Sequence, residues 1–280
     1  MHPAMKHINQ FLGNSALGIV GAGHLGQAIA HGLLESGFPR SQLTICHRGS
    51  PGTHSQLVAS GLPDCLAERR EVVRRSKIML YTVRPQDYQV LMDCTLRSDS
   101  LLVSFLAGIS LARLPISLPE EQRVRVMIST PDTLRQKNGI AAMYPADNLI
   151  VHELLVALKL RVFTLQSEKD LHAFTALGSC LPIVLTYWES LGHQVDLAAL
   201  LAMAAKYQLP DYSQVVAWAR AVQPGGLSSE ELTVYIGKAA TPGGVTEAIL
   251  REIMAGECLT VALEHGVERS RQLGSTANGG

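Results

Sequence analysis

The stretch that decides the fold is residues 17–34, which read L-G-I-V-G-A-G-H-L-G-Q-A-I-A-H-G-L-L. A short apolar run leads directly into G-x-G-x-x-G, and the residues after it have the spacing of an amphipathic helix. In such a turn the first glycine permits the tight bend, the second lets the backbone approach a pyrophosphate, and the third lets helix and strand pack closely. Backbone N–H groups at the start of the helix then face the phosphates. The pattern predicts a dinucleotide-binding loop, against the alternative of a glycine-rich turn without a ligand; its contacting residues would be Gly21, Ala22, Gly23, His24, Leu25 and Gly26.

Short apolar runs alternate with helix-like stretches from Ala16 to about Val162. This alternation indicates βαβ units, and right-handed crossovers between them give a doubly wound, mostly parallel sheet of the Rossmann type. The predicted strands are residues 17–20, 43–46, 78–83, 101–105, 124–128 and 161–165, and the predicted helices between them include 25–36, 67–76, 86–96 and 147–158.

After Leu165 only helical periodicity remains, with apolar residues at three- and four-residue spacing. Ser167 with Asp170, and Ser228 with Glu231, have the spacing of capping boxes at helix starts. The fold class is therefore α/β, with an N-terminal Rossmann-type doubly wound sheet and a C-terminal all-α domain. A boundary near Gln166 gives domains at residues 15–166 and 167–274. Residues 1–14 and about 274–280 are expected to be disordered ends.

Composition excludes several classes of function. Lys plus Arg and Asp plus Glu both number 24, so no basic excess points to nucleic acid or to an anionic membrane. The five cysteines are odd in number and show no C-x-x-C or Cys/His metal spacing, so we predict reduced thiols and no metal site. No apolar stretch is long enough to span a bilayer, and the first residues lack the apolar segment of a secretory signal. The chain is expected in the cytosol.

The end of the second predicted strand favours one cofactor over another. It reads C-H-R-G-S at residues 46–50 and lacks the acid that usually holds the ribose 2′-hydroxyl of NAD. Arg48 offers a planar fork for a 2′-phosphate, Ser50 offers a hydroxyl, and His47 can assist. We therefore predict NADPH rather than NADH, against the alternative that Arg48 is only a solvated loop cation.

A second helix start lies near the C-terminus, where residues 240–256 read A-T-P-G-G-V-T-E-A-I-L-R-E-I-M-A-G. Two glycines precede a helix that is predicted to begin near Val245, and the backbone amides of such a turn suit a carboxylate or a phosphate. Thr246 adds a hydroxyl to the first turn. The alternative is that Pro-Gly-Gly only joins two helices and that Thr246 is a cap; the physics of the sequence leaves both open.

Six motifs follow one another along the chain. They are G-I-V-G-A-G-H-L-G-Q-A-I at the glycine loop, V-R-P-Q at 83–86, L-A-G-I-S at 106–110, R-V-M-x-x-T-P at 125–131, T-A-L-G-S at 175–179 and, the most specific, T-P-G-G-V-T at 241–246. Their order resembles the pyrroline-5-carboxylate reductase family over about residues 16–273. The resemblance implies an NAD(P)H-binding Rossmann domain, a helical domain that forms a dimer by interlocking with its partner, and reduction of the cyclic imine of pyrroline-5-carboxylate to L-proline.

The resemblance also implies roles for individual residues. Thr246 corresponds to the family's threonine that hydrogen-bonds the ring nitrogen, and is the catalytic residue in this reading. The substrate would be bound by Gly243, Gly244, Val245 and Thr246, with the amides of the last three on its carboxylate. Further cofactor contacts would come from Val83, Arg84, Pro85, Ala107, Gly108 and Ser129.

Two departures from the family keep the substrate open. Ser129 stands where the family usually has Asn, and Cys180-Leu181-Pro182 replaces its Gly-Pro-Ala. Three readings follow: an NADPH-dependent pyrroline-5-carboxylate reductase, a related reductase of a different cyclic imine or keto acid, and a non-catalytic NADPH-binding homologue. In each the protein is expected to be a homodimer or a larger homo-oligomer through its helical domain.

Overall fold

The computed structural model describes residues 3–276. One seven-stranded sheet organises the chain, in the order β2-β1-β3-β4-β5-β6-β7. All neighbouring strands pair in parallel except β5 and β6, which are antiparallel. The strands are β1 (Ala16–Val20), β2 (Leu43–Cys46), β3 (Ser76–Tyr81), β4 (Leu101–Ser104), β5 (Arg123–Ile128), β6 (Gly139–Tyr144) and β7 (Leu160–Thr164). The predicted Rossmann-type sheet is confirmed.

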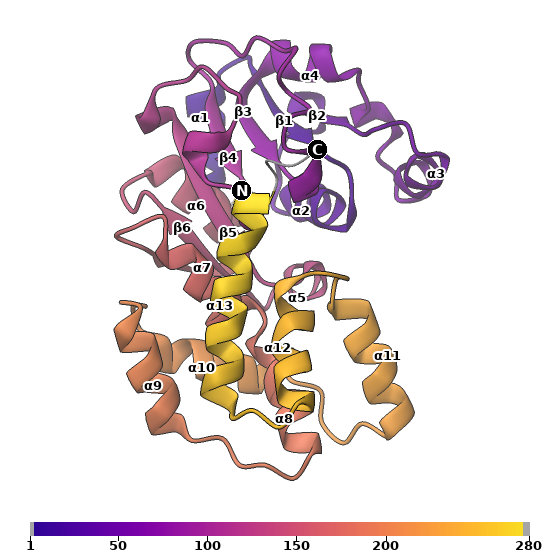
Figure 1. The fold of residues 1–280 in the computed structure, drawn as a ribbon. Helices are drawn as coiled ribbons and strands as arrows, with labels where there is room; N and C mark the ends of the chain where they lie inside the picture. Colours follow the sequence, from indigo (N-terminus) through magenta and orange to yellow (C-terminus); the bar gives the residue numbers. More distant parts are fainter. Residues whose placement is uncertain (1–2, 277–280) are drawn as a thin grey trace.

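Helices cover the sheet in the first part of the chain and form the second part alone (Figure 1). The first part contains α1 (Pro3–Leu12), α2 (His24–Glu35), α3 (Pro51–Ala59), α4 (Arg69–Arg75), α5 (Pro131–Arg135) and α6 (Leu149–Ala157). The second contains α7 (Asp170–Phe174), a π-helical turn η6 (Thr175–Ser179), α8 (Leu181–Ser190), α9 (Leu197–Lys206), α10 (Tyr212–Val222), α11 (Ser229–Ala239), α12 (Val245–Met254) and α13 (Leu259–Thr276). The division into domains at residues 15–166 and 167–274 stays a prediction.

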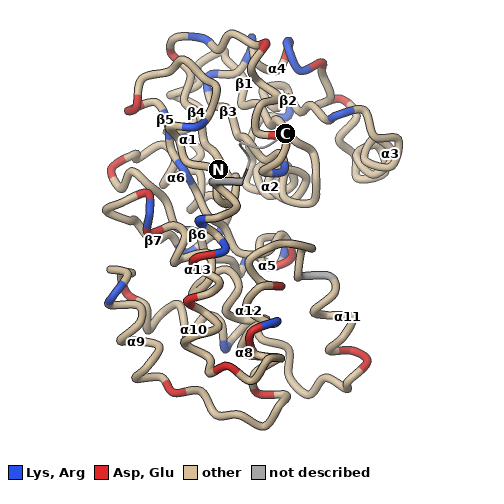
Figure 2. Tube along the Cα trace, in the orientation of Figure 1, with Lys and Arg blue, Asp and Glu red and all other residues tan. Residues whose placement is uncertain are grey.

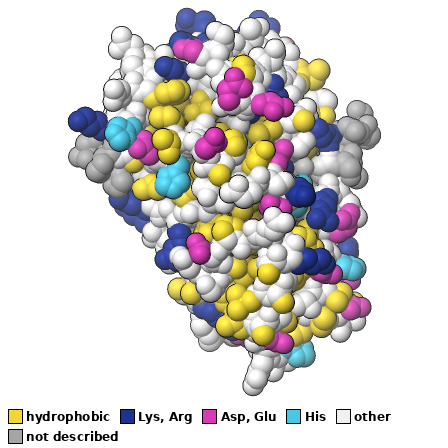
Figure 3. Space-filling view, turned by 90° about the vertical axis from the view of Figure 1, so that its left-hand side faces the viewer, with side chains coloured by type: hydrophobic (Ala, Val, Ile, Leu, Met, Phe, Trp, Pro, Cys, Tyr) yellow, Lys and Arg dark blue, Asp and Glu magenta, His cyan; other side chains and the backbone are white. Residues whose placement is uncertain are grey.

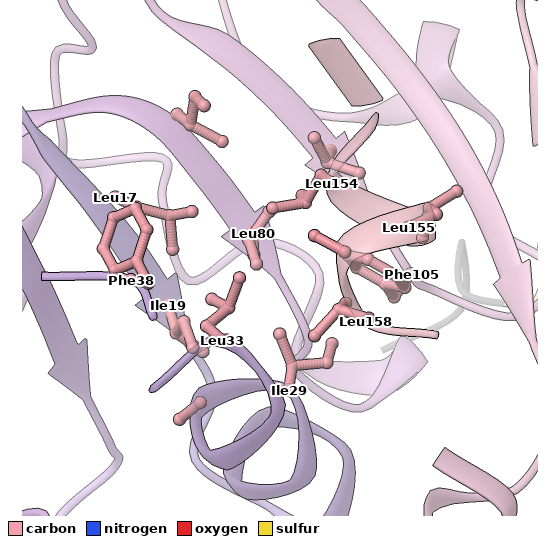
Figure 4. Close-up of a cluster of buried hydrophobic side chains, with 14 of the residues drawn as sticks. Leu17, Ile19, Ile29, Leu33, Phe38, Leu80, Phe105, Leu154, Leu155 and Leu158 are labelled. Atoms are coloured by element: carbon pink, nitrogen blue, oxygen red, sulfur yellow. The ribbon is translucent and has the colours of Figure 1, made fainter. Parts of the chain in front are cut away.

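The core on one face of the sheet is aliphatic. Figure 4 shows Leu17, Ile19 and Leu80 of the central strands facing Ile29 and Leu33 of α2, and all five side chains are fully buried. Such a two-layer contact removes the apolar face of each element from water and is the main source of its stability. It fixes α2 against β1, and therefore fixes the glycine loop between them.

The expectation of a disordered N-terminus is wrong for residues 3–12, which form α1. Met5, Ile8 and Leu12 recur at helical spacing and are buried in the same core, where α1 packs on α6. The signal was present in the sequence, as three apolar residues on one helix face. At the other end α13 continues to Thr276, and residues 1–2 and 277–280 lie outside the described part.

Three local predictions also need correction. Residues 86–96 form no α-helix: after the 3-10 turn η3 (Pro85–Asp87), tight turns still bury Tyr88 and Leu91 three positions apart. The strand β6 was missed because its sequence, G-I-A-A-M-Y, has little β propensity of its own; it is held between β5 and β7.

The capping box at Ser167 and Asp170 does not form. Helix α7 begins at Asp170 after Lys169, without a side-chain cap. The intervening Glu168 instead turns toward the sheet, where it accepts hydrogen bonds from the Leu111 N–H (2.8 Å) and from Nη1 of the buried Arg125 (3.1 Å). The box at Ser228 and Glu231, in contrast, is confirmed in full.

Charges of both signs are interspersed along the whole fold (Figure 2). Within residues 3–276 no single helix is long and apolar enough to cross a membrane, although the bent pair Asp170–Ser179 and Leu181–Ser190 meets that test by length and composition alone.

Candidate functional site

The loop between β1 and α2 is shaped by its glycines. Gly21 has φ +109°, and a Cβ there would lie 2.6 Å from the Val83 backbone nitrogen. A Cβ on Gly26 would lie 2.1 Å from the Gly21 carbonyl oxygen, so only glycine fits this close approach of helix and loop. Beside Gly23, in contrast, no atom lies within 4 Å of the place a Cβ would take. The loop is thus packed tightly on its inner side and open at Gly23, as a phosphate cradle requires.

Two side chains hold the carbonyl groups of the loop. Thr82 Oγ1 donates to the Gly21 carbonyl at 2.6 Å, and Gln27 Nε2 donates to the Ala22 carbonyl at 2.9 Å. With these oxygens occupied, the N–H groups at the start of α2 are the polar groups left to face a ligand at Gly23. The residues present therefore fit the pyrophosphate of a dinucleotide.

A cavity of about 340 Å³ opens from this loop at the carboxyl ends of β1, β2 and β3, where doubly wound sheets bind nucleotides. It brings together eight of the predicted cofactor residues: Gly21, Ala22, Gly23, His47, Arg48, Ser50, Val83 and Arg84. It also contains residues that sequence reasoning missed, among them Thr53, Arg69 and Asp87.

Arg48, the predicted partner of a 2′-phosphate, already has a carboxylate partner. Its Nη1 forms an ion pair with Oδ1 of Asp87, which lies 39 positions further along the chain. Next to it, His47 Nδ1 accepts the Gly49 N–H at 3.1 Å, and His47 Nε2 lies 3.4 Å from His54 Nδ1. Burial, with a contribution from His54, lowers the pKa of His47. Arg48 is the residue of this group whose side chain always carries a positive charge.

The remaining predicted cofactor residues lie outside the lining of this cavity. His24 is exposed on the first turn of α2, whereas Gly26 is buried. Ser129 is 2% exposed, and its hydroxyl is engaged inside the β5–α5 turn, with Thr133 Oγ1 at 2.7 Å and the Ile140 N–H at 3.0 Å. Its predicted cofactor contact stays a prediction, as do those of Leu25 and Pro85.

The turn at Ala107 and Gly108 touches the end of the last helix. Gly108 has φ +78°, and a Cβ there would lie 2.9 Å from the backbone nitrogen of Gly274 in α13. A Cβ on Gly274 would lie 2.2 Å from the Gly108 carbonyl oxygen. The backbones of these two glycines meet here, beside the Cβ of Leu273, which places the C-terminal end of α13 directly behind the predicted cofactor turn.

The second glycine turn precedes α12 and is held from both sides. The Gly243 N–H donates to Glu247 Oε2 at 2.7 Å, and the Gly243 carbonyl accepts from Arg269 Nε and Nη2 at 2.9 and 2.6 Å. The Gly244 N–H donates to the Thr241 carbonyl at 2.8 Å. The amides of Val245 and Thr246 are the first in α12, where backbone N–H groups have no partner within the helix.

Thr246 lies against Cys180, which stands where the family that the sequence resembles usually has glycine. Its hydroxyl, on a side chain that is 8% exposed, donates to Cys180 Sγ at 3.2 Å. Burial raises the pKa of the Cys180 thiol to about 11, so the thiol is protonated at neutral pH and is not a nucleophile. The π-helical turn at Thr175–Ser179 brings Cys180 to this position; such turns are frequent at functional sites.

Across the described range 3–276, no group of three or more His, Cys, Asp or Glu side chains is arranged to hold a metal ion.

A curated protein and solved structures are similar to this chain over about nine-tenths of its length. A family model described as NADP oxidoreductase, coenzyme F420-dependent, matches residues 16–108. The pyrroline-5-carboxylate reductase of Pisum sativum is 28% identical over 272 residues, which are 92% of this chain and 95% of that protein. The structure of 1-pyrroline-5-carboxylate reductase from Streptococcus pyogenes matches with a TM-score of 0.58 at 21% identity, over 92% of this chain and 98% of the other. Plasmodium falciparum pyrroline carboxylate reductase with NADP bound matches with a TM-score of 0.55 at 18% identity, over 93% and 98%.

Proposed function

Since this chain belongs to the pyrroline-5-carboxylate reductase family and is an NAD(P)H-dependent oxidoreductase, we propose that it reduces 1-pyrroline-5-carboxylate to L-proline with NADPH. The observation that carries the proposal is Thr246 at the start of α12, because a buried hydroxyl beside free helix amides can bind a ring nitrogen and a carboxylate together. The helical region would form the dimer interface, and the chain would act in the cytosol.

The choice of NADPH rests on the end of β2. Arg48 and Ser50 line the same cavity as the glycine loop, and no acid follows β2 directly. A guanidinium binds a phosphate through two hydrogen bonds, which a 2′-hydroxyl cannot match. In the proposal His47, Arg48 and Ser50 bind the 2′-phosphate, and Val83, Arg84 and Pro85 contact the adenosine half.

In the proposed reaction the side chains mainly position the substrate. The bound dihydronicotinamide supplies the hydride. The amides of Val245 and Thr246 orient the substrate carboxylate, whereas the Gly244 N–H stays on the Thr241 carbonyl and Gly243 is held in place by Glu247 and Arg269. Thr246 binds the ring nitrogen and so selects the face of the imine that is presented. A protonated imine is already electrophilic, so the proposal needs no strong side-chain acid.

The test is oxidation of NADPH by purified protein in the presence of 1-pyrroline-5-carboxylate, followed at 340 nm with L-proline measured as product. Omission of the imine and replacement by NADH at equal concentration are the controls. Folded protein that binds NADPH but forms no L-proline would rule the proposal out.

A second candidate is a reductase of a different cyclic imine or a keto acid. The Thr246 hydroxyl already donates to Cys180, and the sulfur fills space that glycine leaves open in the family. A panel of five- and six-membered cyclic imines and 2-keto acids separates this candidate from the first. Binding of NADPH without turnover of any of them would favour a non-catalytic homologue.

Cys180→Ala and Cys180→Ser form a matched pair for the same question. Serine offers Thr246 a stronger hydrogen bond than a thiol, whereas alanine offers none. If Thr246 must reach a ring nitrogen, turnover should decrease from the alanine variant to the wild type to the serine variant. Equal rates in all three would show that the contact with Cys180 does not limit Thr246.

A further inference from the structure

The cavity at the glycine loop contains a carboxylate that the cofactor assignment leaves unexplained. Among the described residues that line it, Asp87 is the only acid. It comes from η3, after β3, and not from the end of β2, where an acid that recognises the ribose of NAD usually lies. Its partner is Arg48, the residue to which we assign the 2′-phosphate.

The two partners are held very differently. The Asp87 N–H donates to the Arg84 carbonyl at 2.9 Å, within the turn that Pro85 begins, and its side chain is 23% exposed. The Arg48 side chain is 73% exposed and reaches across to it from the loop after β2. The carboxylate is therefore the fixed member of the pair, and the guanidinium is the member that can move.

From this geometry we propose that Asp87 is a cofactor-selecting residue, which competes with the 2′-phosphate of NADPH for Arg48. The inference rests on the proposed binding of that phosphate by Arg48. A dianionic phosphate that approaches Arg48 meets a carboxylate on the same guanidinium, and like charges repel. The same carboxylate can accept a hydrogen bond from a ribose 2′-hydroxyl, as an acid does in NAD sites. Asp87 thus narrows the preference for NADPH that Arg48 creates.

The experiment compares the wild type with Asp87→Asn, Arg48→Ala and the double variant. Dissociation constants for NADPH and for NADH are measured by cofactor fluorescence or calorimetry, without any imine present. Asp87→Asn should lower the dissociation constant for NADPH by about fivefold, which is the effect of one exposed charge pair. The affinity for NADH should stay unchanged or become weaker. In the Arg48→Ala background the same substitution should lose its selective effect on NADPH.

Several results would overturn the inference. They are a loss of NADPH affinity in Asp87→Asn, an equal change or no change for both cofactors, and an effect that persists without Arg48. Asparagine keeps the shape of the side chain. A thermal melt of Asp87→Ala, compared with that of the wild type, checks that the fold is retained when the side chain is removed. Since only binding is measured, absence of imine turnover would defeat the proposed function and leave this result standing.

Discussion

Thr246 is the residue on which the chemistry of the site depends most directly. Valine keeps its shape and removes the hydroxyl, so Thr246→Val should lower kcat with 1-pyrroline-5-carboxylate by roughly tenfold or more, as expected for loss of one hydrogen bond to a reacting group. NADPH affinity should stay within about twofold, because the hydroxyl contacts Cys180 on the substrate side. Steady-state kinetics measure the decrease in kcat, and a binding titration measures the affinity for NADPH. An unchanged rate would remove Thr246 from the mechanism.

Residues of the site differ in how readily a sequence reveals them. Gly21, Gly23 and Gly26 are recognisable because their spacing alone encodes the turn. Asp87 is not recognisable, since its partner Arg48 lies 39 positions away. Cys180 stands out as a departure from the family pattern, but its contact with Thr246, 66 positions away, could not be predicted. Arg269 has the spacing of a solvated helix face, and only the fold shows that it holds the Gly243 carbonyl, 26 positions away. Contacts across the fold depend on packing, which local patterns do not encode.

At the scale of the β1–α2 element, two glycines make a matched pair of substitutions. Gly26→Ala forces a Cβ against the Gly21 carbonyl oxygen, so we expect destabilisation of about 1–3 kcal/mol and weaker NADPH binding. Gly23→Ala meets no protein atom, so its melting temperature should be unchanged while NADPH affinity falls. Thermal melts and titrations separate the two effects. A Gly23→Ala variant with normal affinity would contradict the position assigned to the pyrophosphate.

The packing of α7 on α13 predicts a dependence of stability on pH. His172 Nδ1 lies 3.0 Å from the buried Ser270 Oγ, and burial, aided by the charges of Arg125 and Arg271, lowers the pKa of His172 to about 4. Between pH 6.5 and 4 the unfolded chain binds more protons at this residue than the folded one, so stability falls as the pH falls. Over this pH range the free energy of unfolding of His172→Asn should decrease by about 1–2 kcal/mol less than that of the wild type. Chemical denaturation at each pH measures both. Parallel curves for both proteins would refute this.

The elements themselves were predictable where one pattern dominated. The strands at residues 43–46 and 124–128 were found because short, mostly apolar runs mark strands covered on both faces, even though Thr44 and Arg125 interrupt them. Strand β6 and the π-helical turn at Thr175–Ser179 were not found, because neighbouring strands in one case and packing around Phe174 in the other set the backbone. Helix α1 differs from both, because the helical spacing of Met5, Ile8 and Leu12 makes it predictable from the sequence.

At the scale of the whole molecule, the helical region exposes apolar surface that a single chain leaves uncovered. Figure 3 shows hydrophobic side chains gathered in the lower half of the molecule, on the side of α9. Leu197 and Leu201 of α9 are exposed large apolar side chains, as are Val234 of α11 and Met254 of α12 on other parts of the helical region. Exposed apolar surface commonly marks an interface.

We therefore expect the wild type to be a dimer in solution and Val234→Glu to shift it toward monomer, because a buried unpaired carboxylate is costly. Sedimentation at several protein concentrations measures the equilibrium. The matched control is Val58→Glu, on α3 in the sheet-containing part of the chain, where Val58 is 47% exposed. This substitution should leave the monomer–dimer equilibrium unchanged. A wild type that is monomeric at all concentrations would contradict the proposed assembly.

Helix α13 has one more consequence for the molecule. Its Arg269 donates hydrogen bonds to the turn before α12, and its Gly274 contacts the turn at Gly108. The two residues that hold these turns are therefore five positions apart on one helix. Along a helix that interval is about 7.5 Å. Because both turns contact the same helix, α13 sets the distance between them. One residue added between 269 and 274 would rotate the contact at residue 274 by about 100° around the helix relative to the contact at Arg269. The length of this interval is therefore as much a part of the site as any side chain in it.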